Sequence, residues 1–298
     1  MAQTKLIWQS KLTLLAVLPV VGASVVLEVR WWALHAPSVS IWTVGLSLLL
    51  ALVVLKLHAA TPGGAFAGAT IAAGLMFSTA TLPYRPWHTA LVPVLAVSLL
   101  AHLATRLGRA QKERLGTAEK RRGRSASQVA SNLGVAALVS DEFAQSFLSA
   151  SRSFSHTIPQ LLFAVGLAAL AEAAADTVSS EVGQVLSLVL GGQPRLITTL
   201  RAVTPGTDGA VSLAGTLAGI AAAVLVSLSG ILALGGNSAM FWVSCAGGVF
   251  GLFFDSLLGA TLERRGWLNN DAVNFLSTAG AVGFALVLLA FLAHSGMK

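Results

Sequence analysis

Long apolar runs dominate the chain, and its polar residues gather in short segments between them. A membrane-spanning helix needs about 20 mostly apolar residues. Apolar runs predict helices at roughly 12–29, 38–56, 64–82, 88–106, 127–148, 156–175 and 272–294. Segment 127–148 has weak hydropathy, because it begins apolar but contains Asp141 and Glu142. The uncharged stretch from 209 to 254 is long enough for two more helices, with Gly235-Gly-Asn237 as the turn between them. No strand-like alternation appears. The pattern predicts an all-α polytopic transmembrane helical bundle of about nine spans, as one integral membrane domain over residues 1–298.

Composition supports this class and excludes several others. Only 10% of the residues are charged. Soluble domains average about 25% charged residues. The single Cys245 rules out disulfides and a cysteine-based zinc site, and the six histidines make no His-x-x-x-His pair. The phosphate-binding loop of P-loop NTPases is absent. Lys5 and Lys11 before the first apolar run resemble a signal peptide, but no clear cleavage site follows, so we expect an uncleaved first span.

Charge sets the predicted orientation. Eight of the 19 basic residues lie between Arg106 and Arg124, in a basic loop predicted at 106–126. If this loop is cytoplasmic and segment 127–148 crosses the membrane, 15 basic residues lie inside and four outside. The N-terminus is then cytoplasmic and the C-terminus outside. Without that crossing, the bias falls to 13 inside against six outside. The crossing arrangement is preferred.

This orientation places every dense polar motif on the cytoplasmic face. The motifs are TPGG (61–64), the basic loop, ADTVSSEVG (175–183), GTDG (206–209) and DSLLGAT (255–261). One composite site facing the cytoplasm, in a bacterial inner membrane, would contain them all.

The acidic stretch 175–183 is the strongest candidate for chemistry. Carboxylates at a membrane boundary are costly unless something binds them. Glu172 and Asp176 share one helical face, whereas Glu181 lies about 140° from Asp176. Either the helix breaks, or Glu181 serves another partner. We predict a break or turn within 177–182, with Asp176 and Glu181 holding Mg²⁺ while nucleotide phosphates complete its coordination. The alternative is acids paired with loop arginines.

A second acid lies in a stripe of small residues. Gly247, Gly251, Asp255 and Gly259 recur every four residues, which is common in membrane helix packing. The carboxylate within the stripe favours a site, and we predict Asp255 as a further catalytic and metal-binding residue. Ser256 and Gly259 are predicted to contact phosphate.

Two polar turns are candidates for nucleotide contacts. The loop Gly206-Thr207-Asp208-Gly209 precedes a predicted helix, whose N-terminus suits phosphate, although Asp208 is also a good helix cap. Asn274, near the start of the last helix, is predicted to contact the nucleotide.

The basic loop has a simple explanation, because juxtamembrane cations set topology and attract anionic lipids. Yet Arg124, Gln128 and Asn132 are spaced by four and carry polarity into a membrane segment. We therefore predict phosphate contacts from these three residues and from one or two of Lys112, Lys120, Arg121 and Arg122, with Lys112 and Lys120 as the first candidates.

With these motifs in this order, the chain resembles the membrane family that includes transmembrane protein 19 and the plastid phytyl-phosphate kinases of tocopherol salvage. The resemblance covers nearly the whole chain. One departure is Asp208, where the family pattern leads us to expect Asn. The matching segments are TPGGAFAG (61–68), the run 112–132, ADTVSSEVG (175–183), LIT…VTPGTDGAVSLAG (196–215) and GLFFDSLLGAT with NNDAVNFLS (251–277).

The resemblance implies a Mg²⁺-dependent lipid phosphokinase that transfers a phosphoryl group from a nucleoside triphosphate, CTP first, to an isoprenoid monophosphate. The partners expected are therefore lipid phosphate, nucleotide and membrane, without nucleic acid; a homo-oligomer is compatible with the sequence. The alternative is a transporter or flippase for an anionic lipid or metabolite. A weaker alternative is a cytidylyltransferase that forms a CDP-lipid.

Overall fold

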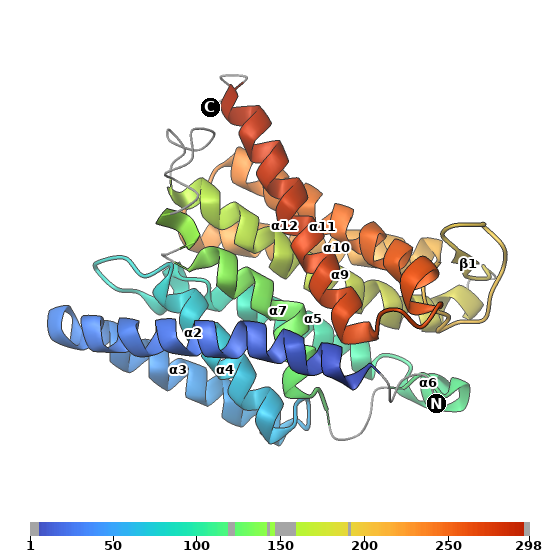
Figure 1. Cartoon of the computed structure of the whole chain (residues 1–298), viewed down its shortest axis with the longest axis horizontal. Coiled ribbons are helices and arrows are strands. Elements are labelled where there is room, and N and C mark those ends of the chain that lie inside the picture. The colour runs from blue at the N-terminus through green and yellow to red at the C-terminus, as the bar shows by residue number, and fades with distance from the viewer. Residues whose placement is uncertain (1–5, 119–122, 142–143, 147–158, 190–191, 295–298) are drawn as a thin grey trace.

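The computed structural model describes residues 6–118, 123–141, 144–146, 159–189 and 192–294, and the described chain is almost wholly helical (Figure 1). Its longer helices are α2 (Ile7–His35), α3 (Pro37–Lys56), α4 (Pro62–Phe77), α5 (Leu91–Arg106), α7 (Ala126–Ser140), α9 (Pro159–Val189), α10 (Leu213–Leu234), α11 (Ser238–Leu258) and α12 (Asn270–His294). Short elements are η1 (Pro86–His88), α6 (Arg109–Leu115), β1 (Arg195–Leu196), β2 (Ala210–Val211) and the π-helix η2 (Gly259–Glu263).

The helices confirm an all-α polytopic membrane bundle. Within the described residues, six helices are long and apolar enough to cross a membrane, and α4 and α5 are shorter apolar helices. The remaining predicted span, 127–148, holds the 15-residue α7. At 1.5 Å per residue, α7 rises only about 22 Å, against a bilayer core of about 30 Å. Part of that segment lies outside the described residues. The turn predicted at 235–237 does separate α10 from α11.

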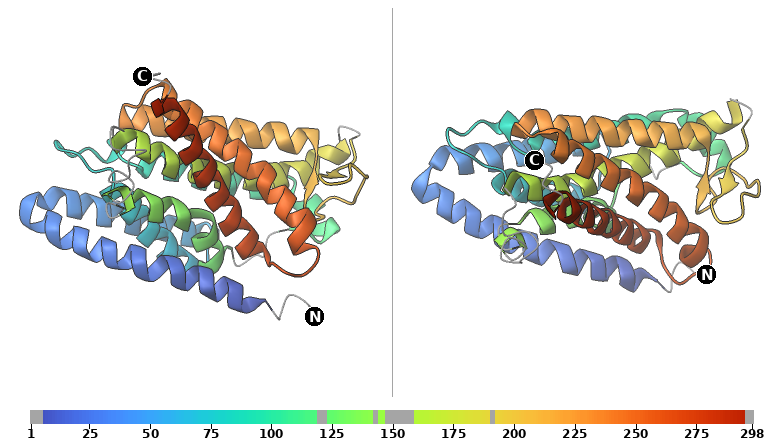
Figure 2. Two further views of the ribbon diagram at one scale, coloured as in Figure 1. Left: turned by 45° about the horizontal axis from the view of Figure 1, so that its top comes forward. Right: turned by 90° about the horizontal axis from the view of Figure 1, so that it is seen from above.

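Helix α9 forms the centre of the bundle. It packs against α5, α7, α10, α11 and α12, and its residues from Phe163 to Ala175 are buried. Figure 2 shows α2 and α3 at one edge and α10 and α11 at the other. Small residues permit this close packing: a Cβ on Gly215 or Gly219 would lie 2.6 Å or 2.8 Å from a carbonyl oxygen of α9. Such contacts are typical of membrane helix interfaces.

The predicted break in the acidic stretch is wrong. Helix α9 runs without interruption through residues 177–182 and ends at Val189. It has 31 residues. At 1.5 Å per residue it is about 46 Å long, so it extends well beyond the hydrocarbon core and carries its acids out to one end of the bundle. The prediction of a span at 156–175 therefore placed the end of this helix too early.

One end of the bundle gathers the polar elements. Helix α6 and strand β1 lie together at the right-hand end of Figure 1, where the last turns of α9 and α11 and the first turn of α12 also lie. Strands β1 and β2 pair antiparallel, with Arg195 opposite Val211 and Leu196 opposite Ala210. This small hairpin, which the sequence pattern did not predict, shapes the loop before α10.

Candidate functional site

A narrow cleft at the polar end brings three of the predicted motifs together. It lies between α9, α11, α12 and the loop before α10, and its volume is about 230 Å³. We call it the acidic cleft. The predicted site residues in its lining are Asp176, Gly206, Thr207, Asp208, Gly209, Asp255, Ser256, Gly259 and Asn274.

Two carboxyl groups lie side by side in this cleft. Asp176 of α9 and Asp255 of α11 both line it, close enough for their charges to interact. One turn earlier in α9, the buried Glu172 accepts a hydrogen bond from Ser277 Oγ at 2.6 Å. Asp255 Oδ1 is also buried, yet it has no hydrogen-bond partner among the described residues. Buried acceptors almost always have a partner, so this oxygen is suited to a ligand.

The pair fits one kind of metal site. Among the described residues, no group of three or more His, Cys, Asp or Glu side chains is arranged to hold an ion by itself. Mg²⁺ does not need such a group, because it is usually bound by one or two carboxylates together with waters and substrate phosphates. Asp176 and Asp255 would supply the protein ligands for Mg²⁺ bound to a nucleotide.

The GTDG loop closes one side of the cleft. Gly206 and Gly209 have φ values of 83° and 73°. Such positive values favour glycine. A Cβ on Gly209 would lie 2.5 Å from Ala260 Cα, so the loop lies directly against η2, which follows α11. Partial desolvation raises the pKa of Asp208, and the nearby positive charge of Arg264 opposes the shift. Asp208 is exposed overall, so solvent screening keeps this effect small.

Sequence reasoning missed Glu263, which also lines the cleft. It ends the π-helix η2 that continues α11. A π-helix winds more slowly than an α-helix, and this brings Glu263 back toward the face that carries Asp255. Single π turns are frequent at functional sites. The hydrophobic pattern gives no signal for such a turn.

Arg124 is held by the TPGG motif rather than by the acidic cleft. Thr61 N donates to Arg124 O at 3.0 Å, and Arg124 N donates to Ala59 O at 3.0 Å. Gly123, with φ of 74°, lies so close to this segment that a Cβ would be 2.5 Å from Ala60 N. A Cβ on Gly64 would collide with Arg124 O. These contacts fix the backbone of Arg124 and give TPGG a structural role.

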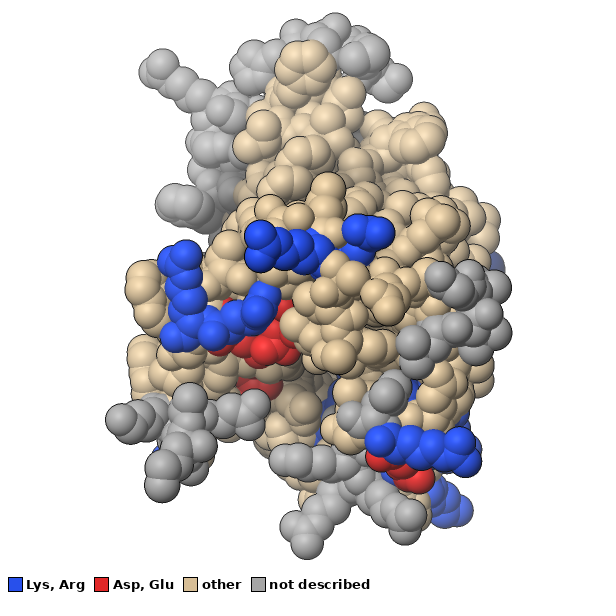
Figure 3. Space-filling view, turned by 90° about the vertical axis from the view of Figure 1, so that its right-hand side faces the viewer, with Lys and Arg blue, Asp and Glu red and all other residues tan. Residues whose placement is uncertain are grey.

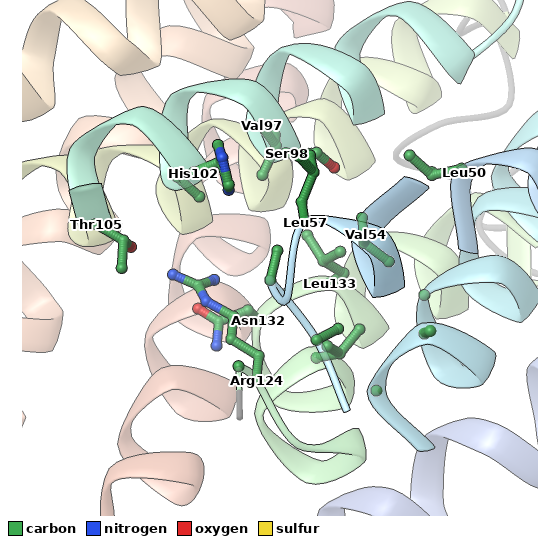
Figure 4. Close-up of a pocket in the computed structure, with 18 of the residues that line it drawn as sticks. Leu50, Val54, Leu57, Val97, Ser98, His102, Thr105, Arg124, Asn132 and Leu133 are labelled. Atoms are coloured by element: carbon green, nitrogen blue, oxygen red, sulfur yellow. The ribbon is translucent and has the colours of Figure 1, made fainter. Parts of the chain in front are cut away.

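The side chain of Arg124 lines a second, larger hollow, which we call the apolar cavity. Its volume is about 540 Å³, and α3, α4, α5, α7 and α9 surround it. Figure 4 shows the Arg124 guanidinium beside the Asn132 amide, toward Thr105, with Leu50 and Val54 farther along the cavity. The predicted composite site is thus divided into two hollows.

Helix α9 forms the wall between the hollows. Its Ala173 lines the apolar cavity and its Asp176 lines the acidic cleft. Arg124 Nη2 reaches this wall and donates to Thr177 Oγ1 at 3.3 Å. On the other side, Asn274 Nδ2 of the cleft donates to Asn132 Oδ1 of the cavity at 3.4 Å. Polar side chains therefore connect the cleft with the cavity.

Lys112 and Glu181, both predicted as site residues, form an ion pair with each other. Lys112 is 1% exposed, and its Nζ donates to Glu181 Oε2 at 2.5 Å and to the carbonyls of Ala104 and Thr105 at 3.0 and 2.9 Å. These contacts use all three ammonium protons. Glu181 therefore faces Lys112, and the geometry does not support its predicted place beside Asp176 on a metal.

Gln128 has a local role. Its Oε1 accepts a hydrogen bond from Ser125 N at 2.8 Å, while Ser125 Oγ accepts one from Gln128 N at 3.3 Å. This reciprocal pair is a capping box that starts α7. The predicted phosphate contacts of Lys120, Arg121 and Arg122 lie outside the described residues. The predicted basic loop 106–126 contains the short helix α6.

The surface over the polar end combines both signs of charge. Figure 3 shows acidic side chains in a hollow, bordered by Lys and Arg side chains. A metal-bound nucleotide carries negative phosphates around a cation, so a rim of basic groups around acids is complementary to it.

Comparison with known proteins identifies the family. Residues 45–282 match the family described as integral membrane protein DUF92. An uncharacterised membrane protein of Synechocystis is 34% identical over 207 residues, which are 66% of this chain and 74% of that protein. Protein VTE6, chloroplastic, of Arabidopsis thaliana is 30% identical over 227 residues, 74% of this chain and 65% of that protein.

An uncharacterised membrane protein of Methanocaldococcus jannaschii is 44% identical over 119 residues, 39% of this chain. That alignment spans about half, 48%, of the archaeal protein. No solved structure matches the chain significantly. The relatives confirm the resemblance to the family of transmembrane protein 19 and the plastid phytyl-phosphate kinases. The match over residues 45–282 shows that this chain belongs to the DUF92 family of integral membrane proteins.

Proposed function

We propose that the protein is a Mg²⁺-dependent lipid phosphokinase that transfers the γ-phosphoryl group of a nucleoside triphosphate, CTP first, to an isoprenoid monophosphate. The product is the isoprenoid diphosphate. The observation that carries this proposal is the pairing of two hollows across α9. An acidic cleft suited to a metal nucleotide lies against an apolar cavity with an arginine at the dividing wall.

The reaction needs positioning and charge compensation more than a covalent nucleophile. Phosphoryl transfer is catalysed mainly by metal ions and by groups that neutralise and align phosphates. The acceptor is itself a phosphate, whose anionic oxygen attacks the γ-phosphorus, so no side chain is needed to deprotonate it. None of the cleft-lining residues is a histidine, which agrees with a reaction that needs no such base.

Each part of the site has a role in this scheme. Asp176 and Asp255 would hold Mg²⁺, which would neutralise charge on the nucleotide phosphates. The Gly206–Gly209 loop offers backbone N–H groups to the same phosphates. Arg124 orients the acceptor phosphate from the cavity side. The hydrogen bond between Asn274 and Asn132 holds the nucleotide side and the acceptor side in a fixed relative position. The nucleoside diphosphate leaves through the open cleft.

The family and the position of the cleft support this proposal. The family includes plastid phytyl-phosphate kinases, and the proposal extends that activity to this chain. The cleft lies at one end of the bundle, whereas the sites of secondary transporters lie near the bilayer centre. We place the protein in the inner membrane with the cleft toward the cytoplasm, where nucleoside triphosphates are available.

One incubation separates the enzyme from its alternatives. Purified protein receives Mg²⁺, CTP labelled at the γ-phosphate or in the base, and geranylgeranyl or phytyl phosphate. Transfer of the γ-label to a lipid diphosphate supports the kinase. Release of pyrophosphate with base label on the lipid would instead show a cytidylyltransferase. Absence of turnover with CTP, ATP, GTP and UTP would refute the kinase and favour transport.

A further inference from the structure

The apolar cavity has two chemically different ends. Near Arg124 its lining includes Arg106, Arg109, His58 and His102. Away from this end the lining is mostly apolar, with Ser98 among the side chains of Leu50, Val54, Val94, Val97 and Leu133. The distance along α5 from Val94 to Arg106 is about 18 Å at 1.5 Å per residue. With a volume of about 540 Å³, the cavity has room for one elongated amphiphile.

Two arginines at the basic end have no ion-pair partner among the described residues, although the Asp176 carboxylate is near enough to Arg124 to interact with it electrostatically. Among the described residues, only Arg109 and Lys112 form ion pairs, with Glu113 and Glu181 respectively. Arg106 and the half-buried Arg124 have no carboxylate within ion-pair distance in that part of the chain. The half-buried guanidinium of Arg124 is costly at a membrane cavity unless an anion binds it, whereas Arg106 is exposed at the same end. Arginine binds phosphate through paired N–H donors.

The flanking helices face lipid. On α3, Leu49 and Leu52 are 54% and 61% exposed, and on α5, Leu99 and Leu103 are 58% and 56% exposed. Such leucines on a membrane helix contact acyl chains. The cavity lies between these two helices, so a lipid tail can enter it sideways from the bilayer without crossing the acidic cleft.

We propose that the apolar cavity binds a lipid phosphate monoester with a single chain, which enters from the bilayer between α3 and α5. Its phosphate lies at Arg124 and Arg106, and its chain extends toward Leu50 and Val54, which limit the chain length. The role of this lipid as the phosphoryl acceptor rests on the proposed function. The binding of the lipid in the cavity does not.

Binding is therefore measured without nucleotide. The protein is placed in phosphatidylcholine nanodiscs and titrated with tritiated geranylgeranyl phosphate, with unlabelled geranylgeraniol and phosphatidic acid as competitors. We expect saturable binding that both competitors displace poorly. Equal displacement by phosphatidic acid would overturn the single-chain assignment, and equal displacement by geranylgeraniol would overturn phosphate recognition.

Two matched pairs of variants test the location. Val54→Trp narrows the cavity, and Leu52→Trp places the same ring on the lipid-facing side of α3. We expect Val54→Trp to weaken geranylgeranyl phosphate about tenfold or more while geranyl phosphate is little affected, since filling a pocket discriminates by size. The Leu52→Trp protein should bind both as the parent does. Equal behaviour of the two variants would overturn the assignment.

The second pair of variants removes one positive charge inside or outside the cavity lining. Arg106→Gln should weaken binding about tenfold or more, the loss expected for one charged hydrogen bond. Arg114→Gln removes an equal charge from α6, away from the cavity lining, and should have little effect. Equal losses would indicate general attraction to basic protein and refute the site. Specific binding without turnover would leave the site standing and refute only the kinase.

Discussion

Replacement of Glu181 by Gln tests whether this acid supports the fold or the chemistry. Glu181 and Lys112 connect α9 with α6 across 69 positions of sequence, and both residues are buried. The two other contacts of Lys112 Nζ are neutral carbonyls at the end of α5. Glu181→Gln therefore leaves a buried ammonium without a counter-charge.

The expected loss is large. Removal of one partner from a buried ion pair costs about 3–5 kcal/mol, because the remaining charge is desolvated and uncompensated. At about 2–4 °C per kcal/mol, the melting temperature should fall by roughly 6–20 °C. Removal of both charges, in Lys112→Met with Glu181→Met, should cost much less, since apolar replacements of buried pairs are often neutral.

The assay follows thermal unfolding of the purified protein in detergent by circular dichroism, with turnover measured well below the transition. The double variant should recover most of the melting temperature lost in Glu181→Gln. The structural role is refuted if Glu181→Gln melts as the parent does but loses turnover, and if the double variant is equally inactive. That outcome would show that Glu181 serves the chemistry, on the metal or through the orientation of Asp176, rather than the fold.

The remaining predictions concern the carboxylate pair and the TPGG motif. Asp176→Asn and Asp255→Asn should each lower turnover by about a hundredfold or more, the scale of losing a transition-state electrostatic contact, while circular dichroism stays unchanged; parental rates in both would exclude the metal site. Gly64→Ala should lower turnover and stability because its Cβ meets the carbonyl of Arg124. The control is Gly63→Ala, whose Cβ would make only an ordinary contact at 3.6 Å. Equal rates and melting temperatures for the two glycine variants would contradict the proposed docking.

Hydropathy predicted most of the bundle because membrane helices can be recognised as long apolar runs with few charged residues. The predicted spans at 38–56 and 272–294 agree closely with α3 and α12. The end of α9 was misplaced because acids were taken to mark its exit from the membrane. A helix can extend beyond the bilayer, and hydropathy does not record where it stops.

Site residues that lie on the inward face of a single helix could be predicted from the sequence. Residues whose role depends on a partner distant in the sequence could not. Asp176 and Asp255 share a cleft because each lies on the inward face of its own helix. Glu181 was expected beside them because Lys112, its partner, is 69 residues away and belongs to a loop that was taken to be free for phosphate. Glu263 depends on the π turn after α11, and Gln128 on a local capping box.

Continuity of α9 has a mechanical consequence. On an unbroken helix, Asp176 and Glu181 are fixed about 140° apart. The bond from Glu181 to Lys112 therefore sets the angle at which Asp176 points. Side chains extend about 5–6 Å from a helix axis, so a turn of about 10° moves a carboxylate by about 1 Å. A displacement of that size can slow catalysis about a hundredfold. The buried ion pair between Glu181 and Lys112 thus restrains rotation of α9 about its axis and keeps Asp176 directed into the acidic cleft.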